Sequence, residues 1–424
     1  MFGTLMSEAA AQSVQHRKLT QAEVDVICLR HDRLWSSRMG GARAVFTWKD
    51  LTGLDLSGRN LCDADFTGAI LVDCKMHGAR LDNANLFGAD MQNADLTEAS
   101  LRRSDLRGAC LRGANLTGAD LFEADLREGA IAAADRERGL RVLEHVDRAT
   151  QAQGVILAGA NLERSRLSGV MAVKADFSDA ILKDAKLVRA NLKQANMNGA
   201  NLAGADLSGA DLAGADMRDT ILVGAKTYSW NVSNADMAGA LTDKTVGHDV
   251  SDLPYDDMLR AHAQWCETGG REGTPSVFDN ADLRSLRSIT GFNLTALSAK
   301  GATFYGLDMS GVQLQGARLE GADLRGCNLR NADLRGARLI GAKLTGSDLR
   351  DAQLGPLVIG PNRTMPCDMS KANLKNVDFA RADMRQAVMA GADLSRANFT
   401  GAFLKGIDVS ECIRDGVRGL DGIF

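Results

Sequence analysis

A five-residue period dominates this sequence and limits the folds that it can adopt. From Leu51 to Ile131, every fifth residue is large and apolar, and from Ala64 to Ala124 a small residue, mostly Ala, stands two places before it. Asp or Asn usually lies between the two. Such spacing fits neither the period of about 3.6 of a helix nor the alternation of a strand. It predicts a chain that turns a corner every five residues, with the large and the small side chain pointing inward.

The inward residues form the predicted core, and Asp, Asn and Gly suit the corners because they tolerate tight-turn backbone angles. Burial should contribute about 1.5–3 kcal/mol for each fully buried Leu, most of it offset by chain ordering. Ala172 and Thr227 replace the large residue, which predicts two weakened layers. The predicted core includes Leu51, Leu56, Leu61, Leu116, Leu121, Leu202, Leu207, Leu324, Leu329 and Leu334.

The repeated unit resembles a known family. Residues 114–118 and 119–123 match the pattern A-(D/N)-L-x-x position by position, which is the consensus of the pentapeptide-repeat family. The resemblance implies a β-solenoid, a right-handed quadrilateral parallel β-helix with four pentapeptides in each coil. Residues 20 apart should then stack, with Asp65, Asn85, Asp105 and Asp125 in one outward column.

Breaks in the period divide the chain into two modules of one design. Each module is expected to hold a helix, repeats, a protruding loop and further repeats. The expected boundaries are a disordered N-terminus at 1–17, module 1 at 18–245, a linker at 246–277 and module 2 at 278–424. Module 1 comprises a capping helix at about 20–39, repeats at 49–131 and 155–237, and the loop 132–155; module 2 comprises repeats at 278–354 and 367–409, the loop 355–366 and a C-terminal cap at 410–424.

Two short helices are expected as a cap and in the linker. Thr20 and Glu23 form a capping-box pattern, and a second helix is expected at about 254–268, with Pro254 at its entrance. Trp35 and Trp265 each follow a Leu-Arg pair at the same interval. We expect these helices to cover the exposed end of each solenoid, with the tryptophans plugging the first coil.

The composition argues against several classes of function. The net charge is −4, too balanced for a nucleic-acid binder. The 8 Cys and 6 His show no metal-ligand spacing, and no catalytic or phosphate-binding motif occurs. A non-enzymatic protein without metal or cofactor is therefore expected. Because no signal-peptide pattern or membrane-spanning apolar run is present, we expect a cytoplasmic location and no membrane insertion.

Three functional hypotheses remain open at this point. The first is a rigid scaffold that presents solenoid faces and loops to a partner protein or complex. The second comes from the resemblance: some bacterial members of the family mimic DNA and bind or protect gyrase, some as dimers through the C-terminus. Residues 50–131 carry 14 acidic and 8 basic residues, whereas 157–237 carry 9 of each, so only the first block suits a mimic. The third is an enzyme that uses Trp265 and Cys266 near the break between the modules.

The non-repeating segments are where partner specificity is expected. A homodimer through the C-terminus is a further expectation, and no direct binding of nucleic acid is expected. The candidate partner contacts are Arg136, Arg138, Arg141, His145, Trp265, Asn362, Arg363 and Met365.

Overall fold

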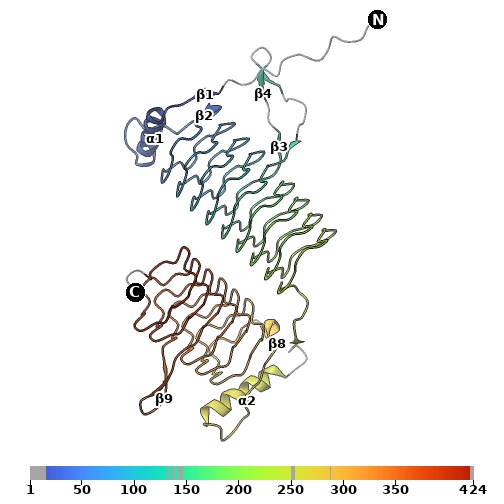
Figure 1. The fold of residues 1–424 in the computed structure, drawn as a ribbon, viewed down its shortest axis with the longest axis vertical. Coiled ribbons are helices and arrows are strands. Elements are labelled where there is room, and N and C mark those ends of the chain that lie inside the picture. The colour runs from blue at the N-terminus through green and yellow to red at the C-terminus, as the bar shows by residue number, and fades with distance from the viewer. Residues whose placement is uncertain are drawn as a thin grey trace. The chain divides into compact units, whose positions relative to one another are not determined.

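The computed structural model describes residues 16–130, 133–135, 139–141, 147–249, 254–286 and 288–420, with only the backbone described at 130, 133–135, 139–141, 147–148, 248–249 and 256. The chain divides into two compact units, Met1–Asp243 and Lys244–Phe424. Each unit is a stack of coils (Figure 1).

Parallel bridges between residues 20 apart define the coil. Asp65 bridges Asn85, Asn85 bridges Asp105, and Asp105 bridges Asp125, which confirms the predicted outward column. Each coil forms four such bridges, one for each pentapeptide. Because a side contributes a single bridged residue, the repeats contain no long strands. Successive coils are joined by backbone bonds, as from the Leu51 amide to the Ile70 carbonyl at 2.8 Å.

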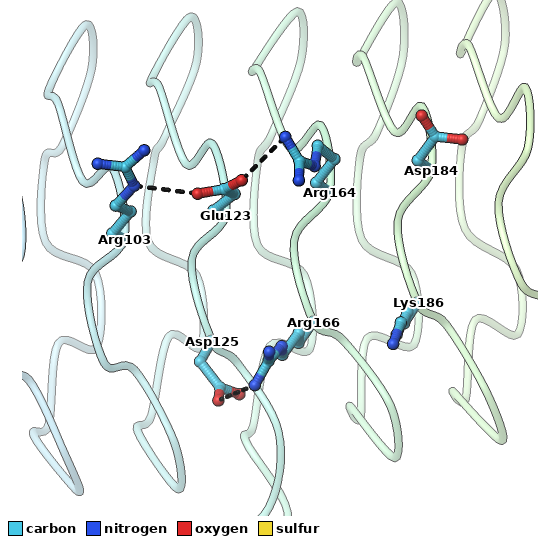
Figure 2. A pocket seen from close by; sticks show the side chains of 7 residues that line it. All are labelled: Arg103, Glu123, Asp125, Arg164, Arg166, Asp184 and Lys186. Atoms are coloured by element: carbon cyan, nitrogen blue, oxygen red, sulfur yellow. Dashed lines mark hydrogen bonds and ion pairs between the residues drawn. The ribbon is translucent and has the colours of Figure 1, made fainter.

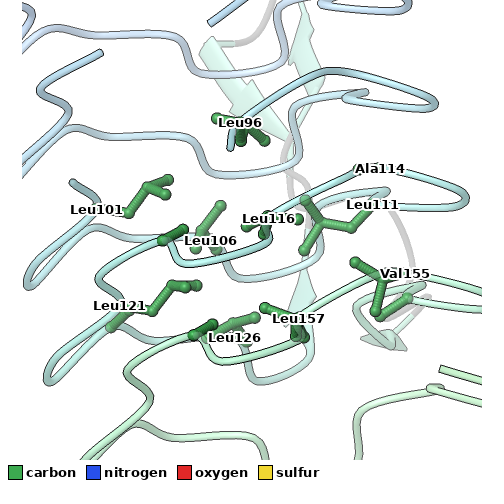
Figure 3. Close-up of a cluster of buried hydrophobic side chains, with 14 of the residues drawn as sticks. Leu96, Leu101, Leu106, Leu111, Ala114, Leu116, Leu121, Leu126, Val155 and Leu157 are labelled. Atoms are coloured by element: carbon green, nitrogen blue, oxygen red, sulfur yellow. The ribbon is translucent and has the colours of Figure 1, made fainter. Parts of the chain in front are cut away.

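The interior of each unit is a continuous column of apolar side chains. Figure 3 shows leucines of successive coils meeting inside unit 1. Each of the ten leucines named above is at most 1% exposed. The alanines two places before them are buried as well, as at Ala114 and Ala119. Small side chains predominate there, because the large residues fill most of the narrow interior, although Leu297, Leu307 and Val312 are also buried at this position in unit 2.

The corners depend on local hydrogen bonds and on left-handed backbone. The Asp50 carboxylate, for example, accepts bonds from the amide and the hydroxyl of Thr52, at 2.8 and 2.6 Å. The second corner residue adopts a positive φ in side after side, as in Gly118 at 67° and Asn93 at 54°. Gly and Asn adopt this conformation at low cost. The Gly, Asp and Asn content of the sequence therefore follows from the corners.

Helix α1 (Gln21–Trp35) covers the first coil of unit 1. The predicted capping box is present: the Thr20 side chain accepts a bond from the Glu23 amide, and the Glu23 carboxylate accepts one from the Thr20 amide. The helix is shorter than the predicted 20–39, because the chain turns after Trp35 and Ser37 adopts a positive φ. β1 (Arg17–Lys18) pairs in parallel with β2 (Lys49–Asp50). Residue 17 is thus part of the fold rather than of a disordered terminus.

The prediction that a tryptophan plugs the first coil is wrong for helix α1. Val24, Cys28 and His31 are the buried residues of α1, whereas Trp35 is 50% exposed. Coil pairing also begins earlier than residue 49, since Val45 already bridges Asp65. Trp35 is the last residue of the helix.

An insertion interrupts unit 1 between two coils. β3 (Gly129–Ala130) pairs antiparallel with β6 (Asp147–Arg148), and β4 (Ala133–Asp135) pairs antiparallel with β5 (Gly139–Arg141). Beyond it, Cys110 bridges Gln151 and not residue 130. The repeats therefore resume at Gln151, earlier than the predicted 155. The sequence obscured this restart, because Ala152 occupies a position that usually holds a large residue.

Unit 2 repeats the design with its own helix. β7 (His248–Asp249) pairs in parallel with β8 (Ala281–Asp282), and helix α2 (Tyr255–Glu267) buries Leu259 and His262. A 3₁₀ turn, Arg284–Leu286, adds one residue to the first coil, so Asp282 bridges Thr303.

The break at 355–366 is a hairpin. β9 (Leu357–Gly360) pairs antiparallel with β10 (Arg363–Met365), and the coil register across it is 30 residues, from Arg338 to Asp368. After the hairpin the coils continue to the bridge between Asn398 and Arg418. Residues 410–418 thus belong to the solenoid, and the predicted separate cap at 410–424 is wrong for them.

The last coil of each unit is more open than the first. Its inward residues are only partly buried although they pack on the core. No further coil of the same unit covers them, so their outer side is left without a neighbour. In unit 1 they are Ala225, Trp230, Val232, Ala235, Met237 and Ala240; in unit 2 they are Ala402, Leu404, Ile407, Val409, Cys412 and Val417.

Candidate functional site

The partner contacts predicted in the unit 1 insertion are mostly outside the described residues. Arg136, Arg138 and His145 lie outside them, and for Arg141 only the backbone in β5 is described. These four residues therefore stay predictions.

The predicted contacts in unit 2 lie on the β9–β10 hairpin, which leaves the stack of coils (Figure 1). Asn362 and Arg363 are exposed, while Met365 packs with Leu357 over the coils. A methyl group added at Gly336 would come within 2.8 Å of Leu357 Cβ and 2.9 Å of Met365 Cε. The base of the hairpin thus rests against a glycine corner.

Two apolar side chains of the hairpin are left facing solvent. Val358 is 74% exposed and Ile359 is 49% exposed. Burying such side chains against a partner would remove apolar surface from water. Sequence analysis did not single out these two residues, although a run of β-branched residues in a predicted loop was a usable signal.

Trp265 and Cys266 lie on α2, where they serve the packing of the helix. The Trp265 ring lies 5.7 Å from that of His262, and the Cys266 thiol is 3.5 Å from the Thr295 carbonyl oxygen. Burial raises the pKa of the Cys266 thiol. A raised pKa disfavours the thiolate that a nucleophilic cysteine needs.

A recurring ion pair neutralises many carboxylates of the solenoid sides. In the sequence D-L-R, Asp333 accepts bonds from Arg335 Nε at 2.9 Å and from Arg335 Nη2 at 2.6 Å. Its Oδ1 also accepts the Arg335 amide at 3.2 Å. The hydrogen bond from the matching arginine lowers the pKa of Asp216 and of Asp383. The same pair forms at Asp105–Arg107, Asp125–Arg127, Asp216–Arg218, Asp282–Arg284, Asp323–Arg325, Asp348–Arg350 and Asp383–Arg385.

A charged hollow of about 530 Å³ lies on unit 1 across the coils on both sides of the insertion. Figure 2 shows its side chains in two rows along the stack. The first row holds Arg103, Glu123, Arg164 and Asp184, and the second holds Asp125, Arg166 and Lys186. Two small residues, Ala124 and Ser165, are buried between the rows.

The guanidinium groups of the hollow are more exposed than the carboxylates that they contact. Arg103 and Arg164 both contact Glu123, at 3.0 and 3.1 Å, and are 64% and 57% exposed against 27% for Glu123. The hydrogen bond from Arg103 lowers the pKa of Glu123. Around Glu123 solvent therefore meets cations first, whereas Asp184 on the same row is itself exposed.

The second row has the same arrangement. Asp125 pairs with Arg127 at 2.6 Å and is 18% exposed. Arg166 is 54% exposed and makes a longer contact with Asp125, at 3.8 Å. Burial raises the pKa of Asp125, but the hydrogen bonds from Arg127 outweigh it, and the pKa is lowered. Asp125 thus stays ionised and satisfied by Arg127, which leaves Arg166 weakly paired.

Other types of site find little support in the described part of the chain. No group of three or more His, Cys, Asp or Glu side chains there could hold a metal ion. None of its helices is long and apolar enough to cross a membrane.

A family model described as pentapeptide repeats matches the chain in 8 copies, over residues 50–88, 84–122, 148–184, 185–224, 313–351 and 367–406. These ranges cover more than half of the chain. The chain belongs to the pentapeptide-repeat family. No curated protein sequence matches it.

Several solved pentapeptide-repeat structures are similar to this chain. Rfr23 of the cyanobacterium Cyanothece 51142 is 25% identical over 30% of this chain and 91% of its own, with a TM-score of 0.24. HetL of Nostoc sp. strain PCC 7120, involved in heterocyst differentiation regulation, is 20% identical over 91% of this chain and 92% of its own, with a TM-score of 0.14. QnrB1, a plasmid-mediated fluoroquinolone resistance protein, is 18% identical over 55% of this chain and 95% of its own, with a TM-score of 0.18.

Sequence analysis of this pentapeptide-repeat chain missed the charged hollow. Its rows combine residues on both sides of the insertion, as Glu123 and Arg164 show. The signal was the charge pattern of each stacked column, but reading it requires the coil register across residues 131–148, which the period alone did not supply.

Proposed function

We propose that this protein is a non-enzymatic scaffold that binds a partner protein or complex through elements projecting from its coils. The family membership supports a right-handed quadrilateral β-helix as the rigid part. A cytoplasmic location is part of the proposal, as is a homodimer in which the open C-terminal coil of unit 2 meets a second copy.

The observation that carries this proposal is the β9–β10 hairpin. Its base is fixed by the packing of Leu357 and Met365 over Gly336. Its exposed Val358 and Ile359 offer apolar surface away from the core. A rigidly anchored apolar element loses little conformational freedom on binding, which favours affinity.

The DNA-mimic alternative requires a dense, unneutralised negative surface to compete for a basic groove. Among the described residues, eight Asp side chains are held by an arginine two residues further along the chain, as in Asp333 with Arg335. This pairing argues against mimicry. Gyrase supercoiling in the presence of the purified protein separates the two functions: a scaffold leaves both the activity and its inhibition by a quinolone unchanged.

The scaffold is tested by mild crosslinking of the tagged full chain in its source cell, followed by identification of what co-purifies. Val358→Ser with Ile359→Ser should lose the partner. The matched control, Val45→Ser with Val277→Ser, changes two valines on solenoid sides that are 51% and 60% exposed, and it should retain the partner. Retention by both double variants, or the absence of any partner with the wild-type chain, would refute the proposal.

A further inference from the structure

The charged hollow of unit 1 presents cations to solvent although its lining is nearly balanced in charge. Its seven lining side chains are four cations and three carboxylates. One of the carboxylates, Asp125, is already satisfied by Arg127, which lies outside the lining. The more exposed members of each ion pair are the arginines. An approaching ligand therefore meets an excess of positive charge.

The arginines of the first row are held in place before any ligand arrives. Arg164 is fixed by Glu123 and by the ring of Phe122, whose centroid lies 5.7 Å from the guanidinium carbon. Arg102 lies over the same ring at 4.6 Å. Stacking on an aromatic ring leaves the guanidinium edge free to donate hydrogen bonds. The hollow thus has prearranged donors suited to carboxylates.

The spacing of the charges selects the class of partner. Coils stack about 4.8 Å apart, so Arg103 and Arg164, two coils apart, are separated by about 9.6 Å along the axis. Glu123 lies between them and Asp184 follows. A nucleic-acid backbone carries uninterrupted negative charge, at about 3.4 Å per phosphate along a duplex strand, and would face both carboxylates. A protein segment whose acidic side chains are separated can place them at the arginines without facing the Glu123 and Asp184 carboxylates.

The position of the hollow adds a second observation. A smaller hollow beside it is lined by Arg127, Glu128, Ser168, Gly169 and Arg189. Residues 127 and 128 directly precede β3, where the insertion leaves the coils. The cationic surface therefore continues to the base of an element that projects from the solenoid, where a bound segment gains further contact area.

We propose that the charged hollow is a docking site for an acidic segment of a partner protein, with Arg103, Arg164, Arg166 and Lys186 as its carboxylate-binding groups. This inference deepens the scaffold function proposed above and rests on it. Asp184 and Glu123 set the spacing of the acids that the site accepts.

The test uses the full chain and a fluorescein-labelled peptide of about ten residues with a glutamate at every third position, which an extended chain spaces about 10 Å apart. Binding of this peptide is followed by anisotropy at low salt. The wild-type chain should bind it saturably and more weakly as salt rises. Combined Arg103→Gln, Arg164→Gln and Arg166→Gln should weaken binding about tenfold, since three exposed ion pairs of modest strength are lost. All three side chains are more than half exposed, so the core should be intact.

A matched control removes the same charge elsewhere. Arg218→Gln, Arg350→Gln and Arg385→Gln together delete three arginines that are bound by their own aspartates. This control should bind the peptide within about twofold of the wild-type chain. Equal loss in both triple variants, no saturable binding, or tighter binding of a DNA oligonucleotide of similar length would overturn the acidic-segment assignment.

Crosslinking in the cell with the same variants distinguishes refutation of the docking site from refutation of the proposed scaffold function. A cellular partner that both triple variants retain would leave the scaffold in place and refute the hollow as its acidic docking site. The absence of any partner with the wild-type chain would refute both.

Discussion

Two coils replace a pair of large side chains by one small and one very large side chain, and a double-mutant cycle can test whether these compensate. Ala172 holds a position where a large residue is usual, and the next such residue along the chain is Phe177. The same exchange occurs in unit 2 with Ala299 and Phe304. All four residues are 0% exposed. We therefore expect that Ala172 does not weaken its layer, because the neighbouring phenylalanine supplies volume to the same coil.

The magnitudes follow from packing. Phe177→Leu leaves a partial cavity and should cost about 1–2 kcal/mol, less than the 3–5 kcal/mol of a Phe→Ala change. Ala172→Leu adds three carbons beside an intact phenylalanine and should cost about 1–3 kcal/mol by overpacking. The double variant restores the large pair that the next coil has in Leu192 and Met197. It should cost less than about 1 kcal/mol, which gives a coupling of about 1–5 kcal/mol between the sites.

Hydrogen exchange measures this coupling locally, since a repeat array need not unfold in one step. The Ala172 and Phe177 amides donate to the next coil, to Asn191 at 2.8 Å and Asn196 at 2.7 Å. Their exchange should be faster in each single variant and close to wild type in the double variant. Additive effects of the two changes would show that the residues do not share one space, and would refute the compensation.

Three further predictions concern the caps, the hairpin and the cysteines. Burial lowers the pKa of His262 in the folded protein, so below about pH 6.5 the unfolded chain binds a proton that the folded chain does not. The free energy of unfolding of unit 2 should therefore fall by up to about 1.4 kcal/mol per pH unit as the pH falls toward the folded pKa. In urea titrations, His262→Asn should flatten this dependence. Gly336→Ala should destabilise unit 2 by more than Gly341→Ala, because both have positive φ but only Gly336 faces Leu357 and Met365; equal thermal midpoints would contradict this. Burial raises the pKa of Cys28 to about 11 and those of Cys74 and Cys327 to about 12, so a thiol reagent at pH 8 should modify the half-buried Cys266 and Cys412 first, as peptide mass spectrometry would show.

The sequence was most informative where its period is strict. The stacking of residues 20 apart follows from the spacing of the leucines, and the bridges from Asp65 to Asp125 agree with it. Prediction failed where a side chain departs from its usual size. Ala152 hid the restart of the repeats, and the Ile413 and Arg418 bridges show that a coil continues where the Leu pattern had ended. In such places backbone hydrogen bonds hold the coil, and these bonds do not require a particular residue type that the sequence would reveal.

The site was harder to predict than the fold, because it depends on register across an insertion. Without the bridge between Cys110 and Gln151, nothing in the sequence places Arg164 beside Glu123. The hairpin contacts at Asn362 and Arg363 were identified only as non-repeating residues, whereas the exposed apolar pair Val358 and Ile359 depends on how β9 and β10 pair.

The two buried histidines explain how a coil can begin. Within the stack, the amide of each small residue bonds to the carbonyl three residues earlier, as Ala64 does to Leu61 at 3.1 Å. The first side of each unit has no preceding side to supply that carbonyl. The Ala44 amide donates instead to His31 Nδ1 at 3.1 Å, and the Ser276 amide donates to His262 Nδ1 at 2.8 Å.

A histidine is suited to this place because its neutral ring offers an acceptor on a flat apolar body that can be buried against the core. An amide can only donate, so Nδ1 must be unprotonated in both helices. His31 lies three residues after the buried Cys28, and His262 lies three residues after the buried Leu259. The tryptophans do not keep this spacing, since Trp35 is four residues beyond its histidine and Trp265 is three. The helices are therefore equivalent through their histidines, and α2 marks a second, independent start of the solenoid within one chain.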